Sequence, residues 1–539
     1  MNDPILLIRR WEQLAAERSG FEATWQDIAD SLLGRRDFLS RRGSGERRDV
    51  RIYDGTAMQA ADILAASLHG MLTNPSTRWF ALKIAEGALA EDESVKRWLE
   101  DVEAALYAVF AAPGAGHAQA CHEFYLDLGA FGTAGLHVAD APGRGVSFSA
   151  RALGELYAAE DASGRIDTVF RKYTLTARQA EIEWGAKAGE KILKAIESGR
   201  AEDRFEFIHA TLPRWTHDSR RRDGRAMAFA SCTISLVDRA LVAESGYAEL
   251  PYMIARWSKD AGEIYGRGPG WNALADTKML HVMSKTVIKA AQKVVDPPLL
   301  VADDGVVMPV RTVPGGLNFG RMDGRGDFIK PLQTGARLDV GIEMMEQRRQ
   351  AVRAAFYADT LQMMRDPRMT AAQVYEISAE MMRIMGPVLG RLQAEFLGPM
   401  IARTFAILSR QGALPPAPPV MSGAGLRVEY VSPLARAQKA GQAQAVLRTY
   451  EPALRLAGAD PAILDNFDND EALRVLADAN GLPLKVLRPR EEVEYLRRAR
   501  AEEQQRAAFA SDALMAAEGA GKVLPALTSL AGARRSTAP

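Results

Sequence analysis

Residues 266–298 read GRGPGWNALADTKMLHVMSKTVIKAAQKVVDPP, and this stretch decides the fold. After the glycine cluster, helix-forming residues predict a helix from Trp271 to Val295, about 37 Å long at 1.5 Å per residue. Asp296, Pro297 and Pro298 end the helix, because proline lacks an N–H group and restricts the residue before it. The stretch therefore predicts one long helix with a sharp end.

The chain then returns through a small β segment. Residues 299–335 are rich in Gly, Pro and Val, and Asp303-Asp304-Gly305 is a turn signal between apolar runs. A β-hairpin with loops is expected there. A second long helix is predicted from Leu338 to Leu361, with acidic residues near its start, where the helix dipole favours them. The resulting layout is helix, small β tip, helix.

The chain before this layout combines helices with an antiparallel sheet. Apolar residues at helical spacing predict a pair of helices over 4–36, single helices over 54–71, 91–112 and 117–130, and a second pair over 176–199. Runs of period two predict strands at residues 137–141, 146–151, 166–174, 205–211, 227–237 and 252–257. This part is predicted to be an α+β module.

The chain after the second long helix is predicted to be helical. A very long helix is expected from Thr370 to about Ser409, kinked at Gly386-Pro387 and at Gly398-Pro399. Residues 415–419 indicate a linker, and residues 432 to about 516 indicate further helices before an Ala-rich and Gly-rich tail. The fold class is therefore α+β and mainly helical.

Composition limits the function. The chain has 539 residues with 68 Lys and Arg against 68 Asp and Glu, so its net charge is 68 − 68 = 0. A simple electrostatic binder of nucleic acid usually carries a basic excess, so any DNA contact must be local or weak. The only cysteines, Cys121 and Cys232, support neither a disulfide framework nor a thiolate metal site and suit a reducing cytoplasm. No apolar run is long enough for a signal peptide or a membrane span.

Two motifs offer a chemical alternative to a structural role. The GRGPG cluster at 266–270 precedes a helix, so its amides could hold a phosphate and support a nucleotide-dependent enzyme, although GxGxxG is absent. A structural turn is the other interpretation. His117, Cys121 and His122 include residues that could share a helix face and bind zinc, but a fourth ligand is missing. With no catalytic signature elsewhere, the sequence predicts no enzyme and no cofactor.

A stripe of lysines stands out on the first long helix. Lys278, Lys285, Lys289 and Lys293 follow one another at spacings of 7, 4 and 4, which places them within about 80° on one helix face. An ordinary solvated face is one interpretation. The other is a face turned toward a polyanion, or toward acids such as Glu343 and Glu346 on the returning helix.

With this organisation in hand, the chain resembles the head-to-tail connector, or portal, proteins of short-tailed bacteriophages. The residues that carry the resemblance are spread along nearly the whole chain in the family's order. They are YDGTA (53–57), SLHGMLTNP (67–75), WF (79–80), FGTA (131–134), IYGRGPG (264–270) with Ala273 and Leu274, GPVLGRL (386–392) and SPLARAQ (432–438).

The resemblance implies a ring of identical subunits, usually twelve, at one capsid vertex of the virion, assembled in the host cytoplasm. Double-stranded DNA would pass through this ring during packaging and ejection. The partners implied are terminase, a tail adaptor, and the major capsid protein with its scaffold, and no membrane. The regions implied are a wing (1–265), a first stem helix (266–295), a clip (296–337), a second stem helix (338–361), a tunnel loop (362–370), a long kinked wing helix with linker (371–420), and a crown with C-terminal tail (421–539).

Within this plan, two sets of residues are candidates for function. The DNA-channel candidates are the four lysines of the stripe together with Arg365 and Arg368, which a ring would repeat as circles of weak contacts. Whether the stripe faces the bore or a neighbouring subunit stays open. The candidates for docking of partners on the clip are Asp303, Asp304, Phe319, Phe328 and Ile329. The alternative is that these residues simply fill the β tip.

Overall fold

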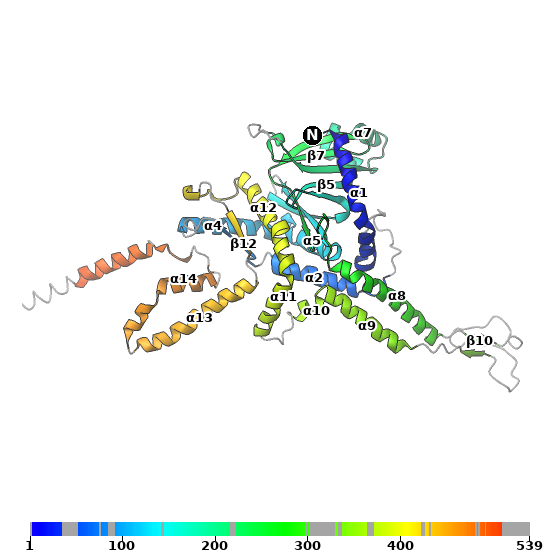
Figure 1. Cartoon of the computed structure of the whole chain (residues 1–539). Coiled ribbons are helices and arrows are strands. Elements are labelled where there is room, and N and C mark those ends of the chain that lie inside the picture. The colour runs from blue at the N-terminus through cyan, green and yellow to red at the C-terminus, as the bar shows by residue number, and fades with distance from the viewer. Residues whose placement is uncertain are drawn as a thin grey trace, which may run out of the picture. The chain divides into compact units, whose positions relative to one another are not determined.

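The structure is a computed structural model, shown in Figure 1. It describes residues 3–34, 52–74, 77–84, 92–141, 145–215, 223–296, 299–301, 329–331, 337–363, 371–421, 426–430, 433–458, 460–479, 482, 486–490 and 492–508. Two compact units are formed, each from several segments of the chain. The larger holds residues 1–82, 102–415 and 428–437, and the smaller holds residues 83–101, 416–427 and 438–539. The mainly helical α+β class is confirmed.

The first helix, α1 (Pro4–Ile28), is a single element. Its start is capped by Asp3, whose carboxylate accepts a hydrogen bond from the N–H of Ile5, and it runs directly into the π-helical turn η1 (Ala29–Leu33). The prediction of two helices over 4–36 is wrong. The helix stays continuous through Gly20 because buried residues on both sides, including Leu14 and Trp25, hold it against the same unit.

A five-stranded antiparallel sheet forms one layer of the larger unit. Its strands follow one another in chain order, and they are β4 (Leu156–Glu160), β5 (Ile166–Thr176), β6 (Arg204–Pro213), β7 (Phe229–Ser235) and β8 (Ala240–Tyr247). The period of two places Ile208 and Ala210 on one face, where Leu7 and Leu14 of α1 pack against them. Figure 1 shows α1 lying along this sheet.

Sequence periodicity found only part of this sheet. The strand predicted over 227–237 is confirmed as the shorter β7, which ends at Ser235, and a tight turn with Arg239 at a φ of 49° leads into β8. Neither β4 nor β8 was predicted. Strand β8 has a mixed burial pattern rather than a strict alternation, because its register with β7 shifts between Thr233 and Ile234.

A three-stranded sheet, in the order β3-β2-β9, lies in the same unit. Its strands are β2 (Thr133–Ala141), β3 (Gly145–Arg151) and β9 (Tyr252–Arg256), all antiparallel neighbours. A polar contact joins it to the larger sheet: the ring of His209 on β6 is 2.8 Å from the hydroxyl of Tyr252 and 2.9 Å from that of Ser231.

His209 should make the stability of the protein depend on pH. Burial, with the nearby charges of Arg171 and Arg151, lowers the pKa of His209 from 6.5 to about 4. The unfolded chain therefore takes up this proton first as the pH falls, so the stabilisation is present above pH 6.5 and is lost toward pH 4. Relative to a His209→Gln variant, the wild-type protein is expected to lose about 1.4 kcal/mol per pH unit across this window. Urea unfolding of both proteins at several pH values measures this, and parallel stability curves would contradict it.

The remaining helices of the larger unit pack around these two sheets. They are α2 (Thr56–Leu72), α5 (His117–Phe131), α6 (Ala177–Trp184), α7 (Glu190–Glu197), and the short turns η2 (Pro113–Ala115), η3 (Leu153–Glu155), η4 (Gly185–Ala188) and η5 (Gly224–Ala226). Helix α4 (Glu93–Ala111) and the two-stranded sheet of β1 (Phe80–Ile84) with β12 (Leu426–Tyr430) contain residues of both units. The helices predicted over 54–71, 91–112, 117–130 and 176–199 are confirmed.

The layout of helix, β tip and helix is confirmed for the described residues. Helix α8 (Pro269–Val295) leads to β10 (Leu299–Val301), which pairs antiparallel with β11 (Ile329–Pro331), and α9 (Leu338–Ala355) returns. Figure 1 shows α8 and α9 side by side, and we call them the α8–α9 hairpin.

The second helix of this hairpin is shorter than predicted. The expected helix over 338–361 is interrupted at Tyr357, which has a φ of 56°, and α10 (Ala358–Met363) follows it. A tyrosine in the left-handed region is strained, so its position is fixed by packing rather than by local preference. The buried neighbours Phe356 and Leu361 supply that packing.

The long helix after residue 370 is also divided. It consists of α11 (Ala371–Leu392), the π-helical turn η6 (Gln393–Leu397) and α12 (Gly398–Arg410). Pro387 lies inside α11, so the helix continues across the first Gly-Pro pair, as predicted. The second pair follows the π turn, which supplies the local change in the helix where Pro399 has no N–H to donate.

The described part of the smaller unit is mainly helical. Its elements include α13, which begins in the larger unit (Pro433–Ala457), the turns η7 (Pro419–Met421) and η8 (Pro461–Asn466), α14 (Asn469–Ala479) and helical residues at 492–508. Among the described residues, no helix is both long enough and apolar enough to cross a membrane.

Candidate functional site

The inner face of the α8–α9 hairpin is built from small and apolar side chains. Ala273, Thr277, Leu280 and Ser284 of α8 are buried at spacings of 4, 3 and 4, which is one face of a helix. Met345 of α9 is buried against this face, and its sulfur lies 3.4 Å from the hydroxyl oxygen of Ser284. This face packs the two helices against each other.

The lysine stripe divides into two pairs with different surroundings. Lys278 forms an ion pair with Asp27 at 2.5 Å, and the amine of Lys285 lies 5.8 Å from the centre of the Tyr53 ring. Both therefore have partners within their own subunit. Lys289 and Lys293 are exposed, and the described residues supply neither with a charged partner.

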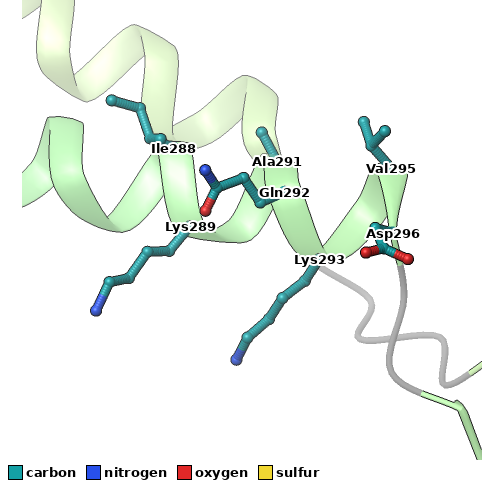
Figure 2. A pocket seen from close by; sticks show the side chains of 7 residues that line it. All are labelled: Ile288, Lys289, Ala291, Gln292, Lys293, Val295 and Asp296. Carbon is teal, nitrogen blue, oxygen red and sulfur yellow. The ribbon is translucent and has the colours of Figure 1, made fainter. Parts of the chain in front are cut away.

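Figure 2 shows Lys289 and Lys293 extending to the same side of α8, while Ile288 and Ala291 lie on the other side. The two lysines help to line an open hollow at the end of α8, with Ile288, Ala291, Gln292, Val295 and Asp296. The hollow is thus apolar on one side and cationic on the other.

The acids of α9 do not neutralise the stripe within one subunit. Glu346 binds Arg353 at 2.8 Å and Arg349 at 3.3 Å, and these hydrogen bonds lower the pKa of its carboxyl. Glu343 is exposed. The interpretation that the stripe turns toward Glu343 and Glu346 of its own chain is therefore wrong for the described residues.

A short segment at the start of α2 fastens the hairpin to the rest of the unit. Asp54 accepts hydrogen bonds from the N–H of Thr56 and from the guanidinium of Arg349, both at 2.9 Å. Burial alone would raise the pKa of Asp54, but these two partners outweigh it and hold the pKa below its ordinary value. The N–H of Tyr53 also donates to His281 of α8 at 3.3 Å. The segment thus contacts both helices of the hairpin.

Sequence analysis did not identify Asp54, Arg349 or His281 as site residues. Only YDGTA was noted, as part of a resemblance, and nothing in the sequence pairs residue 54 with a residue almost 300 positions away. The signal was a polar, glycine-containing string immediately before a helix rich in alanine.

The GRGPG cluster is a place of close backbone approach. A Cβ atom on Gly270 would lie 2.2 Å from the carbonyl oxygen of Ala130, and one on Gly268 would lie 2.7 Å from that of Leu128. These oxygens belong to the C-terminal end of α5, which carries the negative end of the helix dipole and would repel a phosphate. The geometry supports the structural interpretation of this cluster and opposes the nucleotide site.

Two of the three candidate zinc ligands, His117 and Cys121, take part in a buried packing contact, and His122 is only partly buried. The thiol of Cys121 lies 3.4 Å from Nε2 of His117, whose ring packs among Phe110, Phe148 and Trp79. Burial lowers the pKa of His117 to about 3 and raises that of the Cys121 thiol, so both are neutral at pH 7. In the part of the chain that the structure describes, no group of three or more His, Cys, Asp or Glu side chains is arranged for a metal ion.

Comparison with known proteins identifies the family to which this chain belongs. The sequence profile described as "Bacteriophage head to tail connecting protein" matches residues 6–487. The chain belongs to this family. It is 33% identical over 529 residues to a probable portal protein of Bordetella phage BPP-1, covering 96% of this chain and 95% of that one. It is 29% identical over 525 residues to a portal protein of Salmonella phage epsilon15, covering 95% and 94%.

Membership of the portal family fixes the general role. The family is structural and non-enzymatic, and its members are virion proteins that form an oligomeric ring in contact with head and tail components. The absence of a catalytic signature in the sequence accords with this, so the prediction of no enzyme is confirmed.

Several predicted functional residues of this portal-family chain lie outside the described residues. They are Arg365, Arg368, Asp303, Asp304, Phe319 and Phe328. Ile329 is the first residue of β11, where its backbone is in register with Val301. The roles of all seven of these as channel or docking residues stay predictions.

A buried charge cluster in this portal-family chain joins strands β9 and β4 to the π turn η6 between α11 and α12. The sequence did not reveal it. Arg256 at the end of β9 is 3% exposed and binds Glu395 of the π turn η6 at 2.5 Å. Its guanidinium also binds Glu160 of β4, and Lys259 binds the same carboxylate. Burial alone would lower the pKa of Arg256, but the two carboxylates outweigh it and raise that pKa. The cluster fixes where η6 sits on the sheet.

Proposed function

We propose that twelve copies of this chain close a ring at one vertex of the capsid, and that double-stranded DNA passes through its central hole during packaging and ejection. The proposal is carried by one observation: the family match runs over residues 6–487, and within it the chain forms the α8–α9 hairpin with a β tip. The ring is assembled in the host cytoplasm and becomes part of the virion.

The charge of the subunit suits passage of DNA. Duplex DNA carries about one negative charge per 1.7 Å, and each phosphate that a cation neutralises strengthens binding. A strongly basic channel would hold the DNA that it must release. A chain with a net charge of 0 avoids this and leaves only local contacts, for which Arg365 and Arg368 of the tunnel loop (362–370) are our candidates.

The regions are assigned as the family plan implies. The wing is 1–265, the stem 266–295 and 338–361, the clip 296–337, the long wing helix and linker 371–420, and the crown with its tail 421–539. The clip is the docking surface, first for terminase and then for the tail adaptor, through Asp303, Asp304, Phe319, Phe328 and Ile329. The major capsid protein and its scaffold are the further partners.

Electron microscopy of the purified protein tests the proposal directly. Averaged projections are expected to show rings of twelve subunits around a hole wide enough for a double helix. A compact monomer under every assembly condition, or a disc without a hole, would contradict it. ATP turnover by the same preparation is expected to be absent, because terminase, a separate chain, supplies the energy for packaging.

A further inference from the structure

The outward face of α8 is basic along the lower half of the helix, toward β10. With about 100° between successive residues, Lys289 and Lys293 lie roughly opposite the face formed by Leu280 and Ser284, which packs on α9. Val282 lies on the same outward face and is 66% exposed.

The outward face of α9 is acidic over the same part of the hairpin. Glu343 and Asp339 lie roughly opposite Met345, the residue that packs on α8, and both are exposed. Asp339 has a partner in the exposed Arg337 at 3.1 Å, whereas the described residues supply none for Glu343. The hairpin therefore presents a basic side on one helix and an acidic side on the other.

The basic side of α8 and the acidic side of α9 also lie at matching positions along the axis of the hairpin, which we call height. The contact of Ser284 with Met345, and the close approach of Val287 to Gly341, set the two antiparallel helices in register. In this register, Lys289 lies about one turn below Glu343, toward the β tip, and Lys293 lies about one turn below Asp339. Helical side chains lean toward the N-terminus of their own helix, so the lysines lean up and the acids lean down. The charged ends of Lys289 and Glu343 therefore reach the same height, and so do those of Lys293 and Asp339.

A closed ring brings such sides together. Neighbouring copies in a ring meet through two different surfaces, and rotation about the ring axis keeps every residue at its own height. We propose that Lys289 and Lys293 of one copy bind Glu343 and Asp339 of the next copy, so that this part of the stripe is an interface between subunits and not a wall of the DNA channel. This inference rests on the ring of the proposed function.

The proposed interface also explains why the two upper lysines of the stripe differ from the two lower ones. Lys278 and Lys285 lie higher on α8, where Asp27 and Tyr53 of the same subunit already contact them. Among the residues that the structure describes, Lys289 and Lys293 have no such partner, which leaves them available to another copy. Single exposed ion pairs are weak, but the ring repeats both pairs at every subunit boundary.

Charge reversal tests the interface. Lys289→Glu alone and Glu343→Lys alone are each expected to raise the protein concentration for half-maximal ring assembly at least tenfold, because each reversal places two like charges together. The variant with both changes restores the opposite charges and is expected to return assembly to the wild-type range. It is also the matched control, since it carries both substitutions. Light scattering at fixed salt measures assembly, and circular dichroism checks that each subunit is folded.

The outcomes separate this inference from the proposed function. If Lys289→Glu forms rings as readily as the wild-type protein, the inference is wrong, whether or not DNA packaging by those rings then falls. If both single variants assemble poorly and the double variant assembles no better, the pairing is also wrong. If the wild-type protein itself forms no ring, the proposed function fails.

Discussion

Replacing Gly132 with alanine is expected to lower the free energy of unfolding by about 3 kcal/mol or more. Gly132 has a φ of 83°, where a side chain is strained, and a Cβ atom there would lie 2.3 Å from the backbone nitrogen of Gly268. Backbone atoms cannot rotate away as a flexible side chain can. The Gly132 carbonyl also accepts a hydrogen bond from the N–H of Trp257 at 2.9 Å, so movement of this turn would disturb a third segment.

Gly20 provides the matched control for this prediction. It lies in the interior of α1, and no atom lies within 4 Å of the position that its Cβ would take. Gly20→Ala is therefore expected to stabilise the protein by about 0.5–1 kcal/mol, the usual gain from replacing glycine inside a helix. Urea unfolding of the wild-type protein and both variants, followed by circular dichroism, measures the difference. A loss below about 1 kcal/mol for Gly132→Ala would show that the contact can relax.

The elements that the sequence predicted best are those whose burial repeats regularly. The spacing of Ala273, Thr277, Leu280 and Ser284 is visible in the sequence as small and apolar residues at helical period, and α8 formed almost where expected. For this helix, residues close together in sequence determine the structure. The β tip was predicted from the turn signal at 303–305, which lies outside the described residues, whereas the described pairing joins residues 299–301 to 329–331.

The elements that were not predicted from the sequence depend on contacts with distant parts of the chain. Tyr357 ends α9 in a left-handed conformation that no tyrosine prefers, so only its packing explains the break. Glu395 of the π turn η6 binds Arg256, 139 positions earlier, and no local pattern in the sequence pairs these two residues. The stripe of lysines was visible, yet its partners Asp27 and Tyr53 were not, because helical period says which face a lysine occupies but not what faces it.

Breaking the buried charge cluster should have a similarly large effect. Arg256→Met is expected to lower the free energy of unfolding by about 3–5 kcal/mol, because it leaves the largely buried carboxylate of Glu395 without its main cation. That carboxylate is 18% exposed. Among the described residues, it would keep only the backbone N–H of residue 256 as a donor, at 2.9 Å. The carbonyl oxygens of Ile264 and Gly164, which accept hydrogen bonds from the guanidinium at 3.2 and 3.1 Å, would also lose this donor.

A double variant distinguishes loss of the charge pair from loss of packing. In Arg256→Met with Glu395→Met, no unpaired carboxylate remains on η6, so the double variant should be less destabilised than the sum of the two single variants. Arg178→Met is the exposed control, since its ion pair with Glu202 joins side chains that are 55% and 71% exposed, and it should leave stability nearly unchanged. Strict additivity of the two buried substitutions would mean that packing, and not charge, holds η6 on β9. In that case the position of Glu395 in the π turn would be a consequence of the helix geometry and not its cause.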